Sequence, residues 1–213
     1  MDIVCLLFEG ITALDIVGPY EVLQRLPEAK VTFVASSAGE VRTDNGFLAL
    51  VADHSLDEIT HADVLVVPGG FATRALEHDE RLLEWIRAID VTTQWTTSVC
   101  TGSMLLAAAG LLVGKEATTH WASLGRLAEY GAIPTGRRVV EQGKIVTAAG
   151  VSAGIDMGLT LAARIAGDEY AQGIQLGIEY DPQPPFDAGS LSKAPAPVAE
   201  FMTALYSDRG PSS

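Results

Sequence analysis

Short apolar runs alternate with amphipathic stretches along most of the chain. The apolar runs show little alternation of polar and apolar positions, which is typical of strands covered on both faces of a parallel sheet. They lie at 3–8, 31–36, 63–67, 95–99 and 145–149. Helical patterns lie at 16–26, 79–89, 101–109, 120–130, 153–166 and 168–178. Strands that alternate with helices predict an α/β fold: a doubly wound, mostly parallel sheet flanked by helices in a flavodoxin-like three-layer sandwich.

Turn and breaker residues mark the remaining segments. Asn45 and Gly46 form a turn signal inside 41–51, which predicts a small hairpin there. The prolines in 181–190 are incompatible with a helix or an inner strand, so this stretch is expected to be an extended loop. A final amphipathic helix is expected at 196–206.

Composition and charge restrict the possible functions. The chain has 213 residues, 48% of them apolar, which is enough to bury the core of one α/β domain spanning 1–213. The net charge of −13 argues against a nucleic-acid partner and an anionic membrane surface, because both need clustered Lys and Arg. No apolar run reaches the length of a membrane span, no secretory signal is visible and only 2 cysteines are present. We therefore expect a cytoplasmic protein without disulfides.

Cys100 is the strongest candidate for chemistry. It follows the strand pattern at 95–99 and precedes the helical pattern at 101–109, so it is expected on a sharp turn at the carboxyl edge of the sheet. Open α/β sheets place their sites at this edge, and the small neighbour Gly102 suits a strained nucleophile turn. The positive end of the following helix would stabilise a thiolate. The alternative is a buried structural cysteine, which is the interpretation we favour for Cys5 in the middle of its strand.

Asp15 lies where the first strand gives way to a helix. Pro19 fits the first turn of that helix, which places Asp15 just before or at the helix start. This loop also opens at the carboxyl edge of a parallel sheet, so Asp15 and Cys100 can approach one another. A carboxyl group beside a thiol in a partly apolar pocket can transfer a proton. An acid that only complements the helix dipole explains the sequence equally well.

Three further positions adjoin these two residues. Gly69 and Gly70 end a strand, and their N–H groups could face a developing negative charge; a glycine-rich turn between strand and helix also explains them. Thr101 directly follows Cys100, where its hydroxyl could position water, bind a ligand or simply cap the helix. A histidine at position 101 would suit a Cys–His hydrolytic pair, so its absence argues against ordinary peptide or amide hydrolysis.

Histidine placement gives little support for a metal centre. His120 stands beside Trp121 at a predicted helix start, where a packed, hydrogen-bonded side chain is the simpler interpretation and a substrate contact is the alternative. The other histidines, at 54, 61 and 78, add no metal-ligand spacing. Neither a dinucleotide fingerprint nor a Walker loop is present. We therefore expect a protein that uses neither a metal nor a cofactor.

Four motifs occur in order over nearly the whole chain. They are V-P-G-G-F (67–71), S-V-C-T-G-S-M-L-L-A-A-A-G-L-L-V-G (98–114), A-T-T-H-W (117–121) and T-A-A-G-V-S-A-G-I-D-M-G-L (147–159). Together they resemble the ThiJ/PfpI superfamily, whose members have a class I glutamine amidotransferase-like fold. The resemblance covers 2–190 and implies a single domain of that fold.

Two branches of this superfamily share the C-T-G and T-T-H-W motifs. One is the sensor half of AraC-type regulators; we expect no DNA-binding helix-turn-helix domain here, because few residues and little positive charge follow the proline-rich loop. The other comprises the isocyanide hydratases, which the segments D-I-V-G-P-Y-E-V-L (15–23) and Q-L-G-I-E-Y-D-P-Q-P-P-F-D-A-G-S (175–190) resemble. The protease branch has His after the Cys, and glyoxalase-like members usually have Glu where Asp15 stands. Both departures point away from those activities.

The resemblance to isocyanide hydratases implies cofactor-free hydration of a small-molecule isocyanide to an N-substituted formamide. It implies that Cys100 attacks the isocyanide carbon to give a thioimidate, that Asp15 transfers protons, and that Asp15 or Thr101 directs the water. It also implies a homodimer, in keeping with the high apolar fraction of the chain. The alternatives are a glyoxal or methylglyoxal hydratase and a redox-sensing protein whose cysteine oxidises to a sulfinate.

Overall fold

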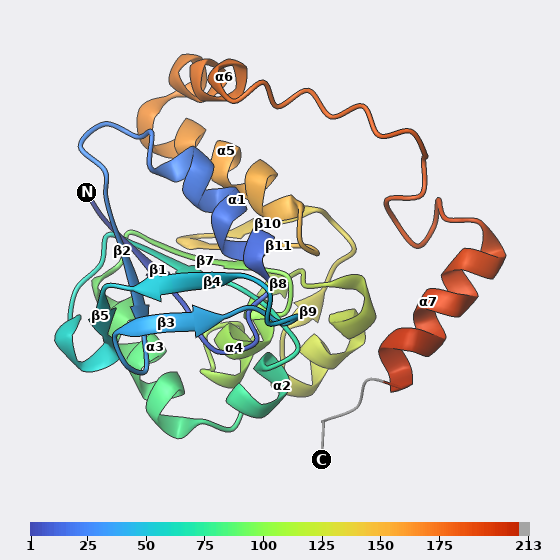
Figure 1. Cartoon of the computed structure of the whole chain (residues 1–213), viewed down its shortest axis with the longest axis horizontal. Coiled ribbons are helices and arrows are strands. Elements are labelled where there is room, and N and C mark those ends of the chain that lie inside the picture. The colour runs from blue at the N-terminus through green and yellow to red at the C-terminus, as the bar shows by residue number, and fades with distance from the viewer. Residues whose placement is uncertain (209–213) are drawn as a thin grey trace.

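A seven-stranded sheet forms the middle layer of the molecule (Figure 1). The computed structural model describes residues 1–208. The strand order is β10-β11-β7-β6-β1-β2-β5, and only β10, at one edge, runs antiparallel to its neighbour. The strands are β1 (Asp2–Leu6), β2 (Lys30–Ala35), β5 (His54–Ser55), β6 (Val64–Val67), β7 (Trp95–Val99), β10 (Val139–Gln142) and β11 (Ile145–Ala148). The prediction of a mostly parallel sheet is confirmed.

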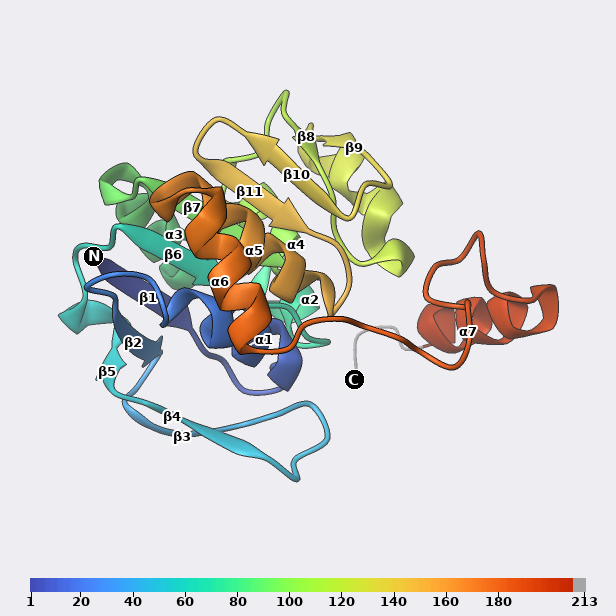
Figure 2. The same ribbon diagram turned by 90° about the horizontal axis from the view of Figure 1, so that it is seen from above.

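Helices cover both faces of this sheet and complete a three-layer sandwich (Figure 2). The helices of one layer are α1 (Ala13–Leu23), α5 (Ala153–Ala166) and α6 (Asp168–Gly177). Those of the other layer are α2 (Thr73–Leu76), α3 (Glu80–Thr92) and α4 (Gly102–Ala108). The 3-10 helices are η1 (Leu56–Glu58) and η2 (Trp121–Tyr130), and η2 packs against α4. The predicted fold class is therefore confirmed.

The order of the strands changes direction between β1 and β6. From β1 the chain moves outward to β2 and β5, then returns to β6 on the other side of β1 and continues to β7. Such a switch point leaves a crevice outside the carboxyl ends of the strands, where open α/β sheets bind ligands. Gly69 and Cys100 lie in the turns that follow β6 and β7, and Asp15 lies in the first turn of α1, which follows β1, so all three are at this edge of the sheet.

Burial explains which strands the sequence pattern revealed. All four residues of β6 are 0% exposed, because helices cover both faces of the sheet at this central position. The edge strand β10 is only partly buried and contains Glu141 and Gln142, so it showed no apolar run and was not predicted. The two-residue strands β5, β8 (Glu116–Ala117) and β9 (Ile133–Pro134) are too short to produce a pattern.

The predicted hairpin is present, but two predicted helices differ in detail. Strands β3 (Gly39–Arg42) and β4 (Ala49–Ala52) pair antiparallel around the turn at Asn45 and Gly46, which confirms the hairpin. The segment predicted as an α-helix at 120–130 forms the 3-10 helix η2, whose Gly125 is a poor α-helix former. The placement of Pro19 in a first helical turn was wrong. Because α1 already begins at Ala13, this proline lies in the helix interior and Asp15 lies in the first turn.

The C-terminal segment leaves the three layers after α6 and extends away from them (Figure 2). Residues 181–190 are exposed and lack regular structure, which confirms the predicted loop. They lead to α7 (Ala196–Asp208), which confirms the predicted final helix. Helix α7 returns to contact η2. Within residues 1–208, no helix is both long and apolar enough to cross a membrane.

Candidate active site

Cys100 occupies a strained turn between β7 and α4. Its φ angle is +57°, a left-handed conformation that residues other than glycine rarely adopt. Hydrogen bonds to the Cys100 backbone hold the turn. The Cys100 N–H donates to the carbonyls of Ala148 and Ala149, both at 3.1 Å, and the Cys100 carbonyl accepts from Thr119 Oγ1 at 2.7 Å. The neighbouring strand and loop therefore fix the direction of the Cys100 side chain.

Glycine at position 102 is required by the same turn. A Cβ atom at Gly102 would lie 2.2 Å from the Val67 carbonyl oxygen and 2.7 Å from that of Pro68. Real Cβ atoms do not approach backbone oxygen this closely, so any side chain here would push α4 away from β6. The absence of a side chain lets the start of α4 pack directly against the turn that follows β6, which brings Cys100 close to Gly69.

Asp15 is a fully buried carboxyl group beside Cys100. It is 0% exposed, its Oδ2 accepts from the Gly69 N–H at 3.0 Å, and its Oδ1 accepts no hydrogen bond of standard geometry from residues 1–208. Burial raises the pKa of Asp15 to about 7, although the Gly69 N–H and the Cys100 thiol oppose this shift and the charge of Asp44 adds to it. A carboxyl group with a pKa of about 7 can both accept and donate protons near neutral pH.

The surroundings of Cys100 raise the pKa of its thiol. Cys100 is 6% exposed, and burial raises the pKa of its thiol well above the ordinary value, with the charge of Asp15 as the second cause. The N–H groups of Val151 and Thr101 act in the opposite direction but are weaker. The sequence suggested that the start of the following helix would stabilise a thiolate, whereas burial and the charge of Asp15 favour the protonated thiol. Reaction at sulfur needs a base to remove the thiol proton, and Asp15 is the carboxyl group beside it.

Val151 contributes a second strained backbone position at the site. Its φ angle is +35°, which is costly for a β-branched residue. This conformation places the Val151 N–H where it interacts with the Cys100 sulfur and lowers the pKa of the thiol. The strain is thus located at a contact to the candidate nucleophile.

Gly69, Gly70 and Thr101 form a rigid support for the pair. The Gly69 N–H bonds Asp15, while Thr101 Oγ1 accepts from the Gly70 N–H at 3.0 Å and donates to the Gly70 carbonyl at 3.1 Å. Both glycine N–H groups are already used, which corrects the expectation that they face a developing negative charge. The Thr101 hydroxyl uses its only hydrogen on Gly70 and keeps one lone pair that can accept a hydrogen bond from water.

His120 lies in the wall of the site as a neutral ring. Its Nδ1 accepts from the Ala122 N–H at 3.3 Å, which places the ring proton on Nε2. Burial lowers its pKa, so the ring stays uncharged at neutral pH. It packs against Trp121 with ring centroids 5.3 Å apart. The structure therefore supports the packed-side-chain interpretation and also places His120 at the pocket.

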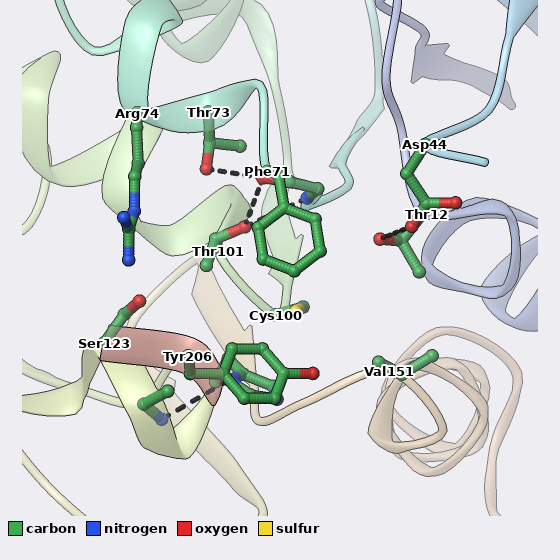
Figure 3. Close-up of a pocket in the computed structure, with 13 residues that line it drawn as sticks. Thr12, Asp44, Phe71, Thr73, Arg74, Cys100, Thr101, Ser123, Val151 and Tyr206 are labelled. Atoms are coloured by element: carbon green, nitrogen blue, oxygen red, sulfur yellow. Dashed lines mark hydrogen bonds between the residues drawn. The ribbon is translucent and has the colours of Figure 1, made fainter. Parts of the chain in front are cut away.

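A small cavity of about 130 Å³ opens above Cys100 (Figure 3). Sequence reasoning identified Gly70, Cys100, Thr101 and His120 in its lining. It missed Thr12, Asp44, Phe71, Thr73, Arg74, Ala122, Ser123, Val151 and Tyr206. Thr12 precedes α1 at the carboxyl edge of the sheet, so its position was predictable. Tyr206 comes from α7, at the far end of the exposed loop, and no local pattern indicated its position.

Two other groups of reactive side chains lie away from this cavity. Cys5 is 1% exposed inside β1, and burial raises the pKa of its thiol to about 12, as expected of a structural cysteine. Asp2, His61 and Asp63 place ligand atoms within 4.8 Å of one another at the amino ends of β1 and β6. This cluster is mostly exposed, and Asp63 already accepts the Asp2 N–H at 2.8 Å. It lies at the opposite edge of the sheet from Cys100.

Comparison with known proteins gives the family of the chain. A model of the DJ-1/PfpI family matches residues 1–164. The chain belongs to the DJ-1/PfpI family. This match includes β1, β6 and β7, together with Asp15 and Cys100, and it confirms the resemblance to the ThiJ/PfpI superfamily.

Individual members of the family resemble the chain to different degrees. An isonitrile hydratase from Pseudomonas putida is 45% identical over 92% of this chain and 85% of its own length. The crystal structure of a ThiJ/PfpI family protein from Pseudomonas syringae superposes with a TM-score of 0.94 at 41% identity, covering 97% of this chain and 86% of that one. Drosophila melanogaster DJ-1beta gives a TM-score of 0.75 at 22% identity over 84% of this chain and 97% of its own, which shows the shared fold alone.

Proposed function

We propose that the protein hydrates isocyanides, also called isonitriles, to N-substituted formamides through a covalent intermediate on Cys100. The observation that carries the proposal is a buried thiol that lines a small cavity, with a buried carboxyl group of raised pKa directly beside that thiol. The Pseudomonas putida isonitrile hydratase supports it, because the two chains are 45% identical and align over 92% of this one. No step of this chemistry requires a cofactor.

The first step forms the thioimidate. The terminal carbon of an isocyanide is electrophilic toward a soft sulfur nucleophile. As Cys100 Sγ bonds to this carbon, the Asp15 carboxylate accepts the thiol proton and then delivers it to the same carbon. The product is R–N=CH–S–Cys100, and Asp15 is a carboxylate again. The pKa of about 7 suits Asp15 to both transfers.

The second step adds water to the thioimidate carbon. Thr101 orients the water through its free lone pair. As the water oxygen bonds to carbon, Asp15 accepts one water proton and passes it to the imine nitrogen, which gives R–NH–CH(OH)–S–Cys100 and restores the Asp15 carboxylate. Breaking the C–S bond then returns the hydroxyl proton to sulfur by way of Asp15. The released product is R–NH–CHO, and the Cys100 thiol is regenerated. Gly69 and Gly70 hold Asp15 and Thr101 in position, and His120 forms part of the wall.

The rival functions predict different chemistry at the same cysteine. A redox sensor needs a thiolate of lowered pKa, whereas burial and Asp15 raise the pKa of Cys100. A glyoxal or methylglyoxal hydratase is the second candidate, since an aldehyde carbon is also open to attack by the thiol.

Turnover on two substrates distinguishes these functions. The wild-type protein is expected to convert an isocyanide to its formamide and to act on methylglyoxal far more slowly, because only the isocyanide needs a proton delivered to the attacked carbon. Product formation is followed by NMR, with Cys100→Ser as the control for uncatalysed reaction. Faster turnover of methylglyoxal than of every isocyanide tested would overturn the assignment.

We also propose that the protein is a homodimer. Apolar side chains on α6 and on the C-terminal segment project into solvent, with Leu176 and Phe186 each 78% exposed and Phe201 66% exposed. Where exposed apolar side chains lie together in a patch, they are typical of a surface that a second copy of the chain covers. Sedimentation equilibrium at micromolar protein is therefore expected to give the dimer mass. A monomer mass at that concentration would contradict the proposal.

A further inference from the structure

Tyr206 reaches the cavity above Cys100 from outside the three-layer body. It lies near the end of α7, beyond the exposed loop, and its ring is partly buried at the cavity. The ring centroid lies 4.9 Å from that of His120, 5.3 Å from that of Trp121 and 5.9 Å from that of Phe71. A residue remote in sequence thus completes an aromatic cluster beside the candidate nucleophile.

Phe71 and Tyr206 flank the approach to Cys100. In the view of Figure 3 the Phe71 ring lies above Cys100 and the Tyr206 ring below it; the two rings stack on each other with an interplanar angle of 26°. Phe71 belongs to the turn after β6, which also carries Gly69 and Gly70, so one wall of the approach is part of the rigid body. Tyr206 supplies the other wall from α7.

Tyr206 is connected to the body through a long exposed loop. The loop at 181–190 is exposed throughout, and α7 packs on η2 while Val198 and Phe201 remain 47% and 66% exposed. Displacing the Tyr206 ring breaks its contacts with the aromatic cluster but leaves the backbone of the body in place, whereas displacing Phe71 would disturb the turn that holds Asp15 and Thr101. Of these two walls, Tyr206 is the one that a substrate can move or that a substitution can remove.

The linear shape of an isocyanide brings its substituent close to the Tyr206 ring. The R–N≡C unit is linear, so when its terminal carbon contacts Cys100 Sγ the substituent R points away from the sulfur, toward the entrance. A cavity of about 130 Å³ with aromatic walls accepts a compact apolar group and leaves little room for a larger one. The ring that closes the entrance then sets the largest substituent that fits.

We propose that Tyr206 is a specificity-determining residue whose ring closes the entrance to Cys100 and limits substrates to those with compact apolar substituents. This role rests on the proposed function only for the identity of the substrate. Closing of the entrance by the Tyr206 ring affects access to the Cys100 thiol, which can be tested without any isocyanide.

Labelling of Cys100 by reagents of two sizes tests the closure. In a Cys5→Ala background, the rates of reaction with iodoacetamide and with N-(1-pyrenyl)maleimide are compared at one pH. Tyr206→Ala is expected to raise the ratio of the bulky to the small reagent's rate by about tenfold, a typical size for discrimination by one pocket wall. Tyr206→Phe keeps the ring and is expected to leave the ratio within about twofold of the background protein. Tyr170→Ala, the same change on α6 away from the cavity, is a matched control with the same expectation.

The same variants are then assayed with isocyanides. Tyr206→Ala is expected to raise kcat/KM for a naphthyl isocyanide relative to methyl isocyanide by about tenfold. An unchanged labelling ratio in Tyr206→Ala, or an equal rise in Tyr206→Phe or Tyr170→Ala, overturns the role of Tyr206. If Tyr206→Ala changes the labelling ratio but the wild-type protein acts on no isocyanide, the role of Tyr206 in closing the entrance is retained. The proposed isocyanide hydration is then contradicted instead.

Discussion

Cys100→Ala is expected to abolish isocyanide turnover while leaving the fold intact. The Cys100 thiol forms the bond to the substrate carbon, and we assign this role to no other side chain within residues 1–208. Removing a nucleophile of this kind lowers kcat by at least about 10³-fold. The measurement is formamide formation by NMR, with circular dichroism to verify folding. Residual activity within about tenfold of wild type would contradict the covalent mechanism.

Cys5→Ala is the matched control for this experiment. Cys5 is 1% exposed in β1, so its loss removes a small buried group and costs about 1 kcal/mol of unfolding free energy. Turnover is expected to stay at the wild-type level. A loss comparable to that of Cys100→Ala would show that the wrong thiol has been assigned.

Asp15→Asn is expected to lower turnover by about 10² or more. The amide has the same shape, but it cannot accept the thiol proton or return it to carbon. The raised pKa of Cys100 makes this loss more severe than the sequence alone suggested, because the thiol has little tendency to ionise without a base. Intact-protein mass spectrometry is therefore expected to show slow adduct formation on mixing with an isocyanide. A fully active Asp15→Asn protein would remove Asp15 from the mechanism and leave Thr101 or the backbone to direct the water.

The pH dependence separates catalytic from structural effects of Asp15. The wild-type rate is expected to rise as pH increases through the Asp15 pKa of about 7, because the carboxylate is the form that accepts the thiol proton. Burial raises this pKa in the folded state, so the stability that Asp15 contributes is present at low pH and is lost as pH rises through about 7. Above that pH, Asp15→Asn is expected to unfold at the same or a higher temperature than wild type. A lower unfolding temperature there would indicate a structural role.

The chemical centre was predictable because local patterns and sheet geometry act together. The β-branched run before Cys100 and the glycine after it indicate a strand, a turn and a helix, and the structure contains each of them. Parallel strands bring their carboxyl ends to one edge, so the loop bearing Asp15 had to open near Cys100. The family motifs placed Thr101, Gly69 and the His120 segment in the same region.

The remaining features depend on tertiary contacts that no local pattern encodes. The Cys100 pKa follows from how deeply the thiol is buried and from the charge of Asp15, and both arise only in the packed structure. The N–H groups of Gly69 and Gly70 bond Asp15 and Thr101, which only the three-dimensional arrangement shows. Tyr206 reaches the cavity because of the path taken by the exposed loop.

Hydration of isocyanides at Cys100 can be measured directly. Its most direct test mixes the wild-type protein with methyl isocyanide and a larger aryl isocyanide and follows the formamide proton by NMR, with Cys100→Ala in parallel. We expect N-substituted formamide as the sole product, formed by wild type at least about 10³-fold faster than by Cys100→Ala. No formamide above the level of Cys100→Ala for either isocyanide, together with no isocyanide adduct on Cys100, would contradict it.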